Sequence, residues 1–320
     1  MQNRAQKIIK EAGFASAELY PLKEGGSCSQ YWRIKTNEKR AILLIVDGKH
    51  KDFYPYIEIS NFLRRIGVGV PEIYFHDVKS GAIIEEDLGD LTLQDYILNT
   101  KSYKIYRQVI DELLLMQIVG GKKLSECKYL SDRVLGYNTF RWETWYFTRY
   151  FIEFYCGRRI DNHNELEGEF HRLATHIANE PLYLMHRDFQ SKNILIKDGK
   201  IRIVDFQGAR QGLLAYDVVS LLKDPYVEVD HQLMEELIDY YLYRLKNRHN
   251  ITTDPVHFKR TILYCGLQRH MQALGAFAFL SAVEHKVQFA QYIPRAVRYI
   301  VEALAQIGEF PRLLKIVKEC

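Results

Sequence analysis

The segment NILIKDGKIRIVDF, residues 193–206, constrains the fold of this chain more than any other stretch. Apolar and polar residues alternate on both sides of Asp198-Gly199, which is the strongest short-range signal of a β-hairpin. A hairpin brings its two ends together in space, so Asn193 and Asp205 are predicted to lie side by side. The sequence therefore places an amide and a carboxylate at the open end of a two-stranded sheet.

The residues before the hairpin suggest why such a pair is useful. HRDFQSKN (186–193) has the spacing H-R-D-x-x-x-x-N, and Asp-Phe follows the hairpin at 205 and 206. Phosphoryl transfer from ATP needs a carboxylate to accept the hydroxyl proton and oxygen ligands that hold Mg²⁺ on the phosphates. We therefore predict Asp188 as the catalytic base and Asn193 and Asp205 as the magnesium ligands. The structural alternative is that these residues only cap a loop, fill a turn and end a strand, but their joint spacing favours catalysis.

The rest of the chain predicts two unequal lobes. A chain of 320 residues exceeds what one core usually serves. Strand and helix patterns alternate through AQKIIKEAGF, YWRIKT, RAILLIV, YIEISNFLRRIG, EIYFHDV and AIIEEDL, and helical spacing dominates after Thr92, including the chain beyond the hairpin. We expect an α+β fold with a small N-terminal antiparallel sheet plus helix in residues 1–88, and a larger, mostly helical C-terminal lobe in residues 89–320 that holds one hairpin.

Composition narrows the possible partners. The net charge is only +4 and no Lys/Arg-rich block occurs, so nucleic acid is a poor candidate partner. The apolar stretch at 273–283 is too short to cross a bilayer. The five cysteines are scattered without a CxxC pair, as in a reduced, cytoplasmic protein. A small molecule is the expected partner, and no obligate protein partner is implied.

The catalytic segment resembles the aminoglycoside phosphotransferase and choline kinase superfamily, which shares the protein-kinase-like fold but phosphorylates small molecules. Tyr216-Asp217 in AYDVVSLLKD matches the pair that follows the DF motif there. A protein kinase would carry a longer segment ending in Ala-Pro-Glu, whereas only eleven residues separate Asp205 from Asp217 here. The resemblance implies a bilobal kinase fold with ATP and Mg²⁺ as cofactors.

The N-terminal lobe carries two further expectations for ATP. EGGSCSQ precedes a strand, as a loop that covers phosphates with its backbone N–H groups would. A plain hairpin turn is the alternative. The resemblance places adenine against the hinge at Glu85 to Leu88, at the backbone of Glu86 and Leu88. The predicted ATP contacts in this lobe are Gly25, Gly26, Ser27, Ser29, Glu58, Glu86 and Leu88.

One expected residue is missing. Kinase-like folds place a phosphate-binding lysine in the third strand, paired with a glutamate on the next helix. Glu58 lies in that helix, but Leu44 or Ile45 occupies the lysine position. Either another cation reaches the phosphates, with Arg33, Lys49 and Lys51 as candidates, or the chain is a degenerate nucleotide-binding regulator. The presence of Asp188, Asn193 and Asp205 together favours an enzyme.

In lacking this lysine, the chain resembles one branch of the superfamily. That branch comprises the bacterial anomeric kinases of N-acetylmuramate and N-acetylglucosamine used in cell-wall sugar recycling. GVGVPEIYFHD, HRDFQSKNIL, IVDFQGARQGLLAYDVVSLLKD and GLQRHMQALGAFAFL carry this resemblance. It implies phosphorylation of an anomeric sugar hydroxyl. The candidate sugar contacts are Glu143, Trp145, Arg149, Gln190, Gln268 and Arg269.

Other acceptors stay open. The structural alternative is the commoner one for such residues: Trp145 as a helix-core residue and Arg269 as a surface or ion-paired residue. Aminoglycosides are disfavoured because residues 225–320 hold ten acidic against twelve basic residues, where a polycation needs an acidic pocket. A choline-like amino alcohol needs an aromatic cage, which the many tyrosines and tryptophans could supply.

Overall fold

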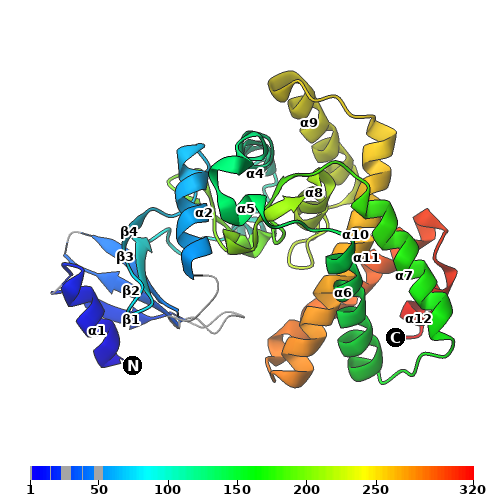
Figure 1. Cartoon of the computed structure of the whole chain (residues 1–320), viewed down its shortest axis with the longest axis horizontal. Coiled ribbons are helices and arrows are strands. Elements are labelled where there is room, and N and C mark those ends of the chain that lie inside the picture. Colours follow the sequence, from blue (N-terminus) through cyan, green and yellow to red (C-terminus); the bar gives the residue numbers. More distant parts are fainter. Residues whose placement is uncertain (1, 15, 23–29, 38, 47–52) are drawn as a thin grey trace.

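The computed structural model describes residues 2–14, 16–22, 30–37, 39–46 and 53–320. A small sheet with two helices lies at one end of the molecule, and a larger helical part lies at the other (Figure 1). This is the α+β, two-lobed arrangement that the sequence predicts, and that expectation is confirmed. The sheet ends at Glu86 and the next helix begins at Leu93. That residues 1–88 and 89–320 are separate domains stays a prediction.

The sheet of the small lobe is antiparallel, with strand order β1-β2-β3-β5-β4. Its strands are β1 (Glu18–Pro21), β2 (Gln30–Lys35), β3 (Arg40–Ile45), β4 (Ile73–Asp77) and β5 (Ala82–Glu86), and its helices are α1 (Gln2–Glu11) and α2 (Phe53–Arg65). Successive side chains of a strand point to opposite faces. Leu43 and Ile45 therefore pack with Ile8 and Ile9 of α1, while Leu44 joins the core that contains α2. Burial on both faces explains why β3 reads as a continuous apolar run.

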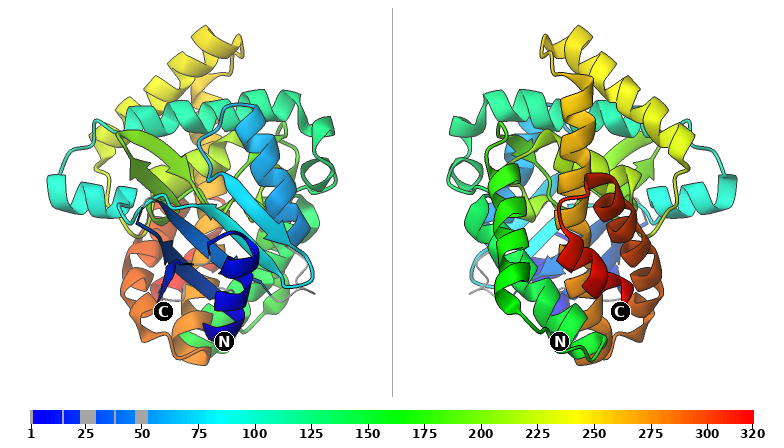
Figure 2. Two further views of the ribbon diagram at one scale, coloured as in Figure 1. Left: turned by 90° about the vertical axis from the view of Figure 1, so that its left-hand side faces the viewer. Right: turned by 90° about the vertical axis from the view of Figure 1, so that its right-hand side faces the viewer.

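The large lobe is built around one long helix. Figure 2 (right) shows α10 running through the middle of the lobe, with α7 on one side and α11 and α12 on the other. Its α-helices are α3 (Leu93–Thr100), α4 (Tyr106–Leu114), α5 (Lys128–Ser131), α6 (Tyr137–Phe147), α7 (His163–Ala178), α8 (Leu214–Leu222), α9 (His231–His249), α10 (Pro255–Ala278), α11 (Ile293–Ile307) and α12 (Pro311–Lys318). Segments of π-helix extend three of them, namely η1 (Leu115–Gly120), η3 (Thr148–Tyr155) and η6 (Phe279–Val283). None of the helices in the described part of the chain is long and apolar enough to cross a membrane.

The predicted hairpin is present as β7 (Ile194–Lys197) and β8 (Lys200–Ile203). Asp198 and Gly199 both have positive φ in its turn, at 52° and 70°. The expectation that this hairpin is the only sheet of the large lobe was wrong. β6 (Tyr183–Met185) and β9 (Arg210–Gly212) form a second two-stranded sheet, so the chain beyond the hairpin is not helical throughout. Three-residue strands are too short to produce a periodic pattern.

Candidate active site

The catalytic loop lies between β6 and β7 and is held by Asp217 at the start of α8. The two carboxylate oxygens of Asp217 accept the backbone N–H groups of His186, at 2.7 Å, and Arg187, at 2.9 Å. Arg187 adopts a positive φ of 80°, which is uncommon for a residue with a side chain. The two hydrogen bonds that Asp217 accepts therefore hold a strained backbone turn directly before Asp188.

The hairpin brings Asn193 and Asp205 to one cavity, as predicted. Ile194 pairs with Ile203, so the residues that flank this pair lie together at the open end of the hairpin. The side-chain nitrogen of Asn193 donates to the backbone oxygen of Asp188 at 2.9 Å. Because the nitrogen of this amide is engaged, its oxygen is the atom that could bind a cation. Both residues line a cavity of about 560 Å³.

The donor set at this cavity suits magnesium. An amide oxygen and a carboxylate are the hard ligands that Mg²⁺ prefers, and the ion usually keeps waters and phosphate oxygens in its other positions. Within the described ranges, no group of three or more His, Cys, Asp and Glu side chains could hold a metal ion without help. A cation held by Asn193 and Asp205 would thus complete its shell from the nucleotide.

Asp188 is surrounded by cations. Nη2 of Arg269, a buried residue of α10, lies 3.3 Å from Oδ1 of Asp188 and donates to Oε1 of Gln190 at 3.0 Å. Burial alone would raise the pKa of Asp188, but Arg269, Arg187 and His186 together lower it below its ordinary value. Asp188 is therefore a carboxylate at neutral pH, which is the form that accepts a proton.

The structure brings only some of the candidate sugar contacts to this place. Gln190 and Arg269 meet at Asp188, as described above. Glu143 is fully buried, and it binds Nη2 of Arg187 at 3.3 Å and Nε2 of Gln268 at 3.0 Å. It lines neither cavity next to Asp188. Glu143 and Gln268 form a layer beneath the catalytic loop, so the geometry gives them a positioning role in place of the expected sugar contact.

Trp145 and Arg149 lie farther along the same helical segment. Trp145 is half-exposed beside Trp142, and Arg149 is ion-paired with Glu153 at 3.1 Å. Neither side chain lines the two cavities that meet at Asp205. The predicted contact of these two residues with a sugar therefore has no support in the geometry.

The cavity of about 560 Å³ extends from Asn193 and Asp205 to the connection between the lobes, where it is lined by Glu86 and Leu88. That their backbones contact adenine stays a prediction. The side chain of Glu86 is ion-paired with Lys197 of β7 at 2.7 Å. Its backbone N–H already donates to the carbonyl of Glu72 at 2.8 Å. Recognition of adenine at this position must then use other backbone groups of the connection.

The phosphate-binding lysine is absent from β3, as expected. Ile42 of β3 faces the cavity, and Leu44 and Ile45 lie in the cores on the two sides of the sheet. Arg33 lines the cavity too, but it is held by Asp87 at 2.8 Å and by Asp90 at 2.7 Å. The other candidates, Lys49 and Lys51, and the expected phosphate loop with Gly25, Gly26, Ser27 and Ser29 lie outside the described residues.

Glu58 does not take the place of the partner glutamate. It is exposed on α2 and is not among the residues that line the cavity. Tyr56 of the same helix points there instead, and its hydroxyl donates to Oε2 of buried Glu85 at 2.7 Å. Burial raises the pKa of Glu85 to about 7. A neutral tyrosine and a carboxyl group thus occupy the region where the sequence suggested a lysine and Glu58.

A second cavity, of about 450 Å³, opens on the other side of Asp205. Its walls come from the catalytic loop and from the residues around β9, namely Arg133, Arg187, Asp188, Asp205, Gln207, Gly208 and Arg210. Asp205 and Gln207 line both cavities, whereas Asp188 lines only the second. Asp188 and Asp205, the predicted base and the predicted metal ligand, therefore lie at the junction of two spaces of ligand size. The three arginines were not among the predicted site residues.

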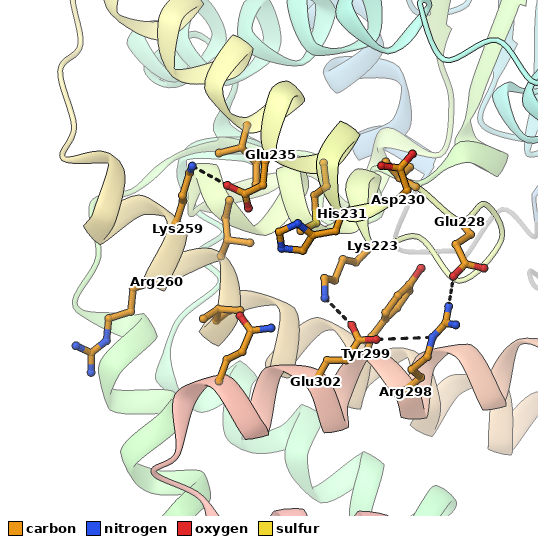
Figure 3. Close-up of a pocket in the computed structure, with 16 residues that line it drawn as sticks. Lys223, Glu228, Asp230, His231, Glu235, Lys259, Arg260, Arg298, Tyr299 and Glu302 are labelled. Atoms are coloured by element: carbon orange, nitrogen blue, oxygen red, sulfur yellow. Dashed lines mark hydrogen bonds and ion pairs between the residues drawn. The ribbon is translucent and has the colours of Figure 1, made fainter.

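A third cavity, of about 480 Å³, lies between α9, α10 and α11 (Figure 3). It shares no lining residue with the other two. Several of its charged side chains pair with one another, as Lys259 does with Glu235 and Lys223 with Glu302, whereas Arg260 pairs with Glu309 outside the cavity. It contains none of Asp188, Asn193 and Asp205, the predicted catalytic and metal-binding residues.

Comparisons with known proteins agree with this geometry. Two curated relatives, from Pseudomonas aeruginosa and Neisseria meningitidis, are named N-acetylmuramate/N-acetylglucosamine kinase. The first is 24% identical over 299 residues, 93% of this chain and 87% of the relative. The second is 24% identical over 268 residues, 83% of this chain and 79% of the relative.

Solved structures share the fold. A choline kinase from Cryptosporidium parvum superposes with a TM-score of 0.67 at 15% identity, covering 99% of this chain and 100% of that one. An aminoglycoside phosphotransferase with bound ADP gives a TM-score of 0.58 at 13% identity, covering 93% and 98%. The profile of the phosphotransferase enzyme family matches residues 18–252, which is more than half of the sequence. The resemblance seen in the sequence is confirmed, and the chain belongs to the phosphotransferase enzyme family.

Proposed function

We propose that this chain is an ATP-dependent kinase that phosphorylates the anomeric hydroxyl of N-acetylmuramate, N-acetylglucosamine or a closely related amino sugar. The observation that carries the proposal is the position of Asp188 and Asp205 at the junction of two cavities. ATP would occupy the cavity next to the connection between the lobes, and the sugar would enter the one that contains Asp188. The names of the curated relatives support the choice of acceptor.

Different residues of the chain would carry out the separate tasks of such a reaction, namely proton acceptance and binding of magnesium. Asp188, kept ionised by Arg269, would accept the proton of the acceptor hydroxyl. An anomeric hydroxyl is more acidic than an ordinary sugar alcohol, so one carboxylate is sufficient as a base. Magnesium, held by Asn193 and Asp205, would neutralise charge on the phosphates. A role in cell-wall sugar recycling in the cytoplasm, expected from the resemblance, is part of this proposal.

The charge of the second cavity argues against the runner-up acceptors. Three arginines face two aspartates there, and Asp188 is already paired with Arg269. Aminoglycosides and choline-like amino alcohols are cations, and a cationic wall repels them. Their kinases share the fold of this chain, so the similarity to them supports phosphoryl transfer without favouring their substrates.

The test is incubation of the purified chain with ATP, Mg²⁺ and a panel of N-acetyl sugars, an aminoglycoside and choline. We expect a new phosphate at C1 of an N-acetyl sugar, located by ³¹P and ¹H NMR. Phosphate at C6, or on an antibiotic or amino-alcohol hydroxyl, would exclude the anomeric assignment. No product from any acceptor would favour the nucleotide-binding regulator.

The role of the base is tested by Asp188→Asn, which should abolish transfer while leaving the dissociation constant of ATP nearly unchanged. Asp198→Asn is the matched control, because Asp198 is exposed in the hairpin turn and asparagine tolerates its positive φ. Turnover that persists in Asp188→Asn would contradict the assignment of the base.

A further inference from the structure

The second cavity carries a cluster of three arginines that the reaction described above does not use. Arg133 lies between α5 and α6, Arg187 in the catalytic loop and Arg210 in β9. Backbone pairing brings these segments together. Arg210 pairs with Met185 across the β6–β9 sheet, and Gln211 forms a bridge with Val134. The fold therefore assembles the cluster from three parts of the chain.

The cluster lacks enough negative charge to balance it. Arg187 is ion-paired with buried Glu143. Arg133 donates to the backbone oxygen of Gln207 at 2.9 Å, and Nε of Arg210 donates to that of Gly208 at 2.9 Å. Within the described part of the chain, neither Arg133 nor Arg210 forms an ion pair with a carboxylate. The two hydrogen bonds to carbonyls fix the direction of each guanidinium group but leave its charge uncompensated.

The two aspartates in the cavity do not remove this excess. Asp188 is ion-paired with Arg269, which does not line this cavity, and Asp205 accepts a hydrogen bond from the side-chain amide of Gln207 at 2.6 Å. Burial, together with repulsion from Arg187 and Arg133, lowers the pKa of Arg210 to about 10. Placing three cations side by side is unfavourable unless an anion joins them.

The geometry does not assign the three arginines to a phosphate of ATP, because none of them lines the cavity at the connection between the lobes. They all line the side that contains the base. Guanidinium groups bind carboxylate and phosphate through two parallel hydrogen bonds, so they suit an acidic substituent of the acceptor.

We propose that Arg133, Arg187 and Arg210 bind a carboxylate or phosphate carried by the acceptor, so that the enzyme selects acidic amino sugars over neutral ones. This inference rests on the proposed transfer to a sugar. It goes beyond that proposal because the relatives are named for an acidic and a neutral sugar together, whereas the arginine cluster predicts a strong preference between the two.

The test compares N-acetylmuramate with its methyl ester, which keeps the shape but loses the charge, and with N-acetylglucosamine. We expect kcat/KM for the acid to exceed that for the ester by about 10- to 100-fold, the range for a hydrogen-bonded charge. Arg210→Met and Arg133→Met should each reduce this ratio at least several-fold. Arg159→Met is the matched control, because Arg159 is exposed and lines neither cavity.

Two further arms separate the possible outcomes. N-acetylglucosamine 6-phosphate tests the source of the charge, since tighter binding of this sugar than of N-acetylmuramate assigns a phosphate and the reverse assigns a carboxylate. Unfolding midpoints establish that both methionine variants fold. An unchanged acid-to-ester ratio in both folded variants would overturn the inference, as would a rise in the KM of ATP without any change in that ratio.

Calorimetry without turnover distinguishes this inference from the proposed function. If N-acetylmuramate binds more tightly than its methyl ester, and Arg210→Met removes this difference in affinity, the anion site is supported even when no sugar is phosphorylated. If the acid, the ester and N-acetylglucosamine are phosphorylated with equal efficiency, the proposed kinase stands and the anion site fails.

Discussion

Replacement of Glu85 by glutamine should remove a large pH dependence of stability. Glu85 is buried beside the nucleotide cavity, and burial raises its pKa from 4.5 to about 7 although Tyr56 donates a hydrogen bond to it. The folded protein therefore retains a proton that the unfolded chain loses between pH 4.5 and 7. Since a change of one in pKa corresponds to about 1.4 kcal/mol, ionisation of this group costs about 3 kcal/mol of folding free energy.

The sign of the effect is fixed by the raised pKa. Below about pH 4.5 the carboxyl group is protonated in both states and carries no penalty. Stability then falls as the pH rises, and the full penalty is present above pH 7. Glutamine never ionises, and its side-chain oxygen still accepts a hydrogen bond from Tyr56. The difference in free energy of unfolding between Glu85→Gln and the wild type should therefore increase in favour of the variant by about 3 kcal/mol between pH 4.5 and 8.

The assay is urea-induced unfolding at pH 5, 6, 7 and 8, followed by tryptophan fluorescence. Glu86→Gln is the control, because the ion pair with Lys197 lowers the pKa of Glu86 overall despite its partial burial. The ion pair of Glu86 stabilises the fold throughout the range above the pKa of the unfolded chain. A plot of the free energy of unfolding against pH for Glu86→Gln should therefore run parallel to that of the wild type between pH 5 and 8. A curve for Glu85→Gln that is also parallel would refute the reasoning.

Three further substitutions test the catalytic loop and its support. Arg269→Met should lower the rate of transfer at neutral pH by about 10- to 100-fold and shift the acid limb of the pH–rate profile to higher pH, because Asp188 loses its main cation. Arg269→Lys should restore part of the rate and part of the shift. An acid limb that does not move in Arg269→Met would contradict this. Asp217→Asn leaves one side-chain oxygen for two backbone N–H groups, those of His186 and Arg187. One buried N–H group then loses its acceptor, so thermal unfolding should show a loss of about 1–3 kcal/mol together with a lower kcat. Gly212→Ala should cost about 1–3 kcal/mol by overpacking, because a Cβ there would overlap the sulfur of Met185; the smaller side chain of Met185→Ala should relieve it.

Local sequence patterns were sufficient to predict that Asn193 and Asp205, the candidate magnesium ligands, lie together. Asn193 and Asp205 are joined by a short hairpin, so alternation and the Asp198-Gly199 turn were sufficient to place them together. Arg269 and Asp188 are 81 positions apart, and the sequence suggested Arg269 only as a candidate sugar contact, not as a partner of Asp188. Contacts over such a distance depend on how helices pack, which periodicity does not specify.

Other parts of the site were outside the reach of sequence patterns. Glu58 and Tyr56 are two positions apart, which is about 200° around a helix, so the choice of the wrong one selects the opposite face of α2. Glu143 looked like a polar group available to a sugar, and only the packing of the helices shows that it is buried under Arg187. The arginine cluster depends on backbone bridges between three segments, and none of these segments alone predicts it.

The wall that Asp205 and Gln207 form between the two cavities has a thermodynamic consequence. A ligand on either side that fixes these side chains changes the affinity for a ligand on the other side, and linkage requires the two changes to be equal. Binding of the nucleotide should thus change the dissociation constant of the acceptor, and binding of the acceptor should change that of the nucleotide by the same factor. The complex with ADP and unreacted sugar, in which no transfer occurs, allows this coupling to be measured.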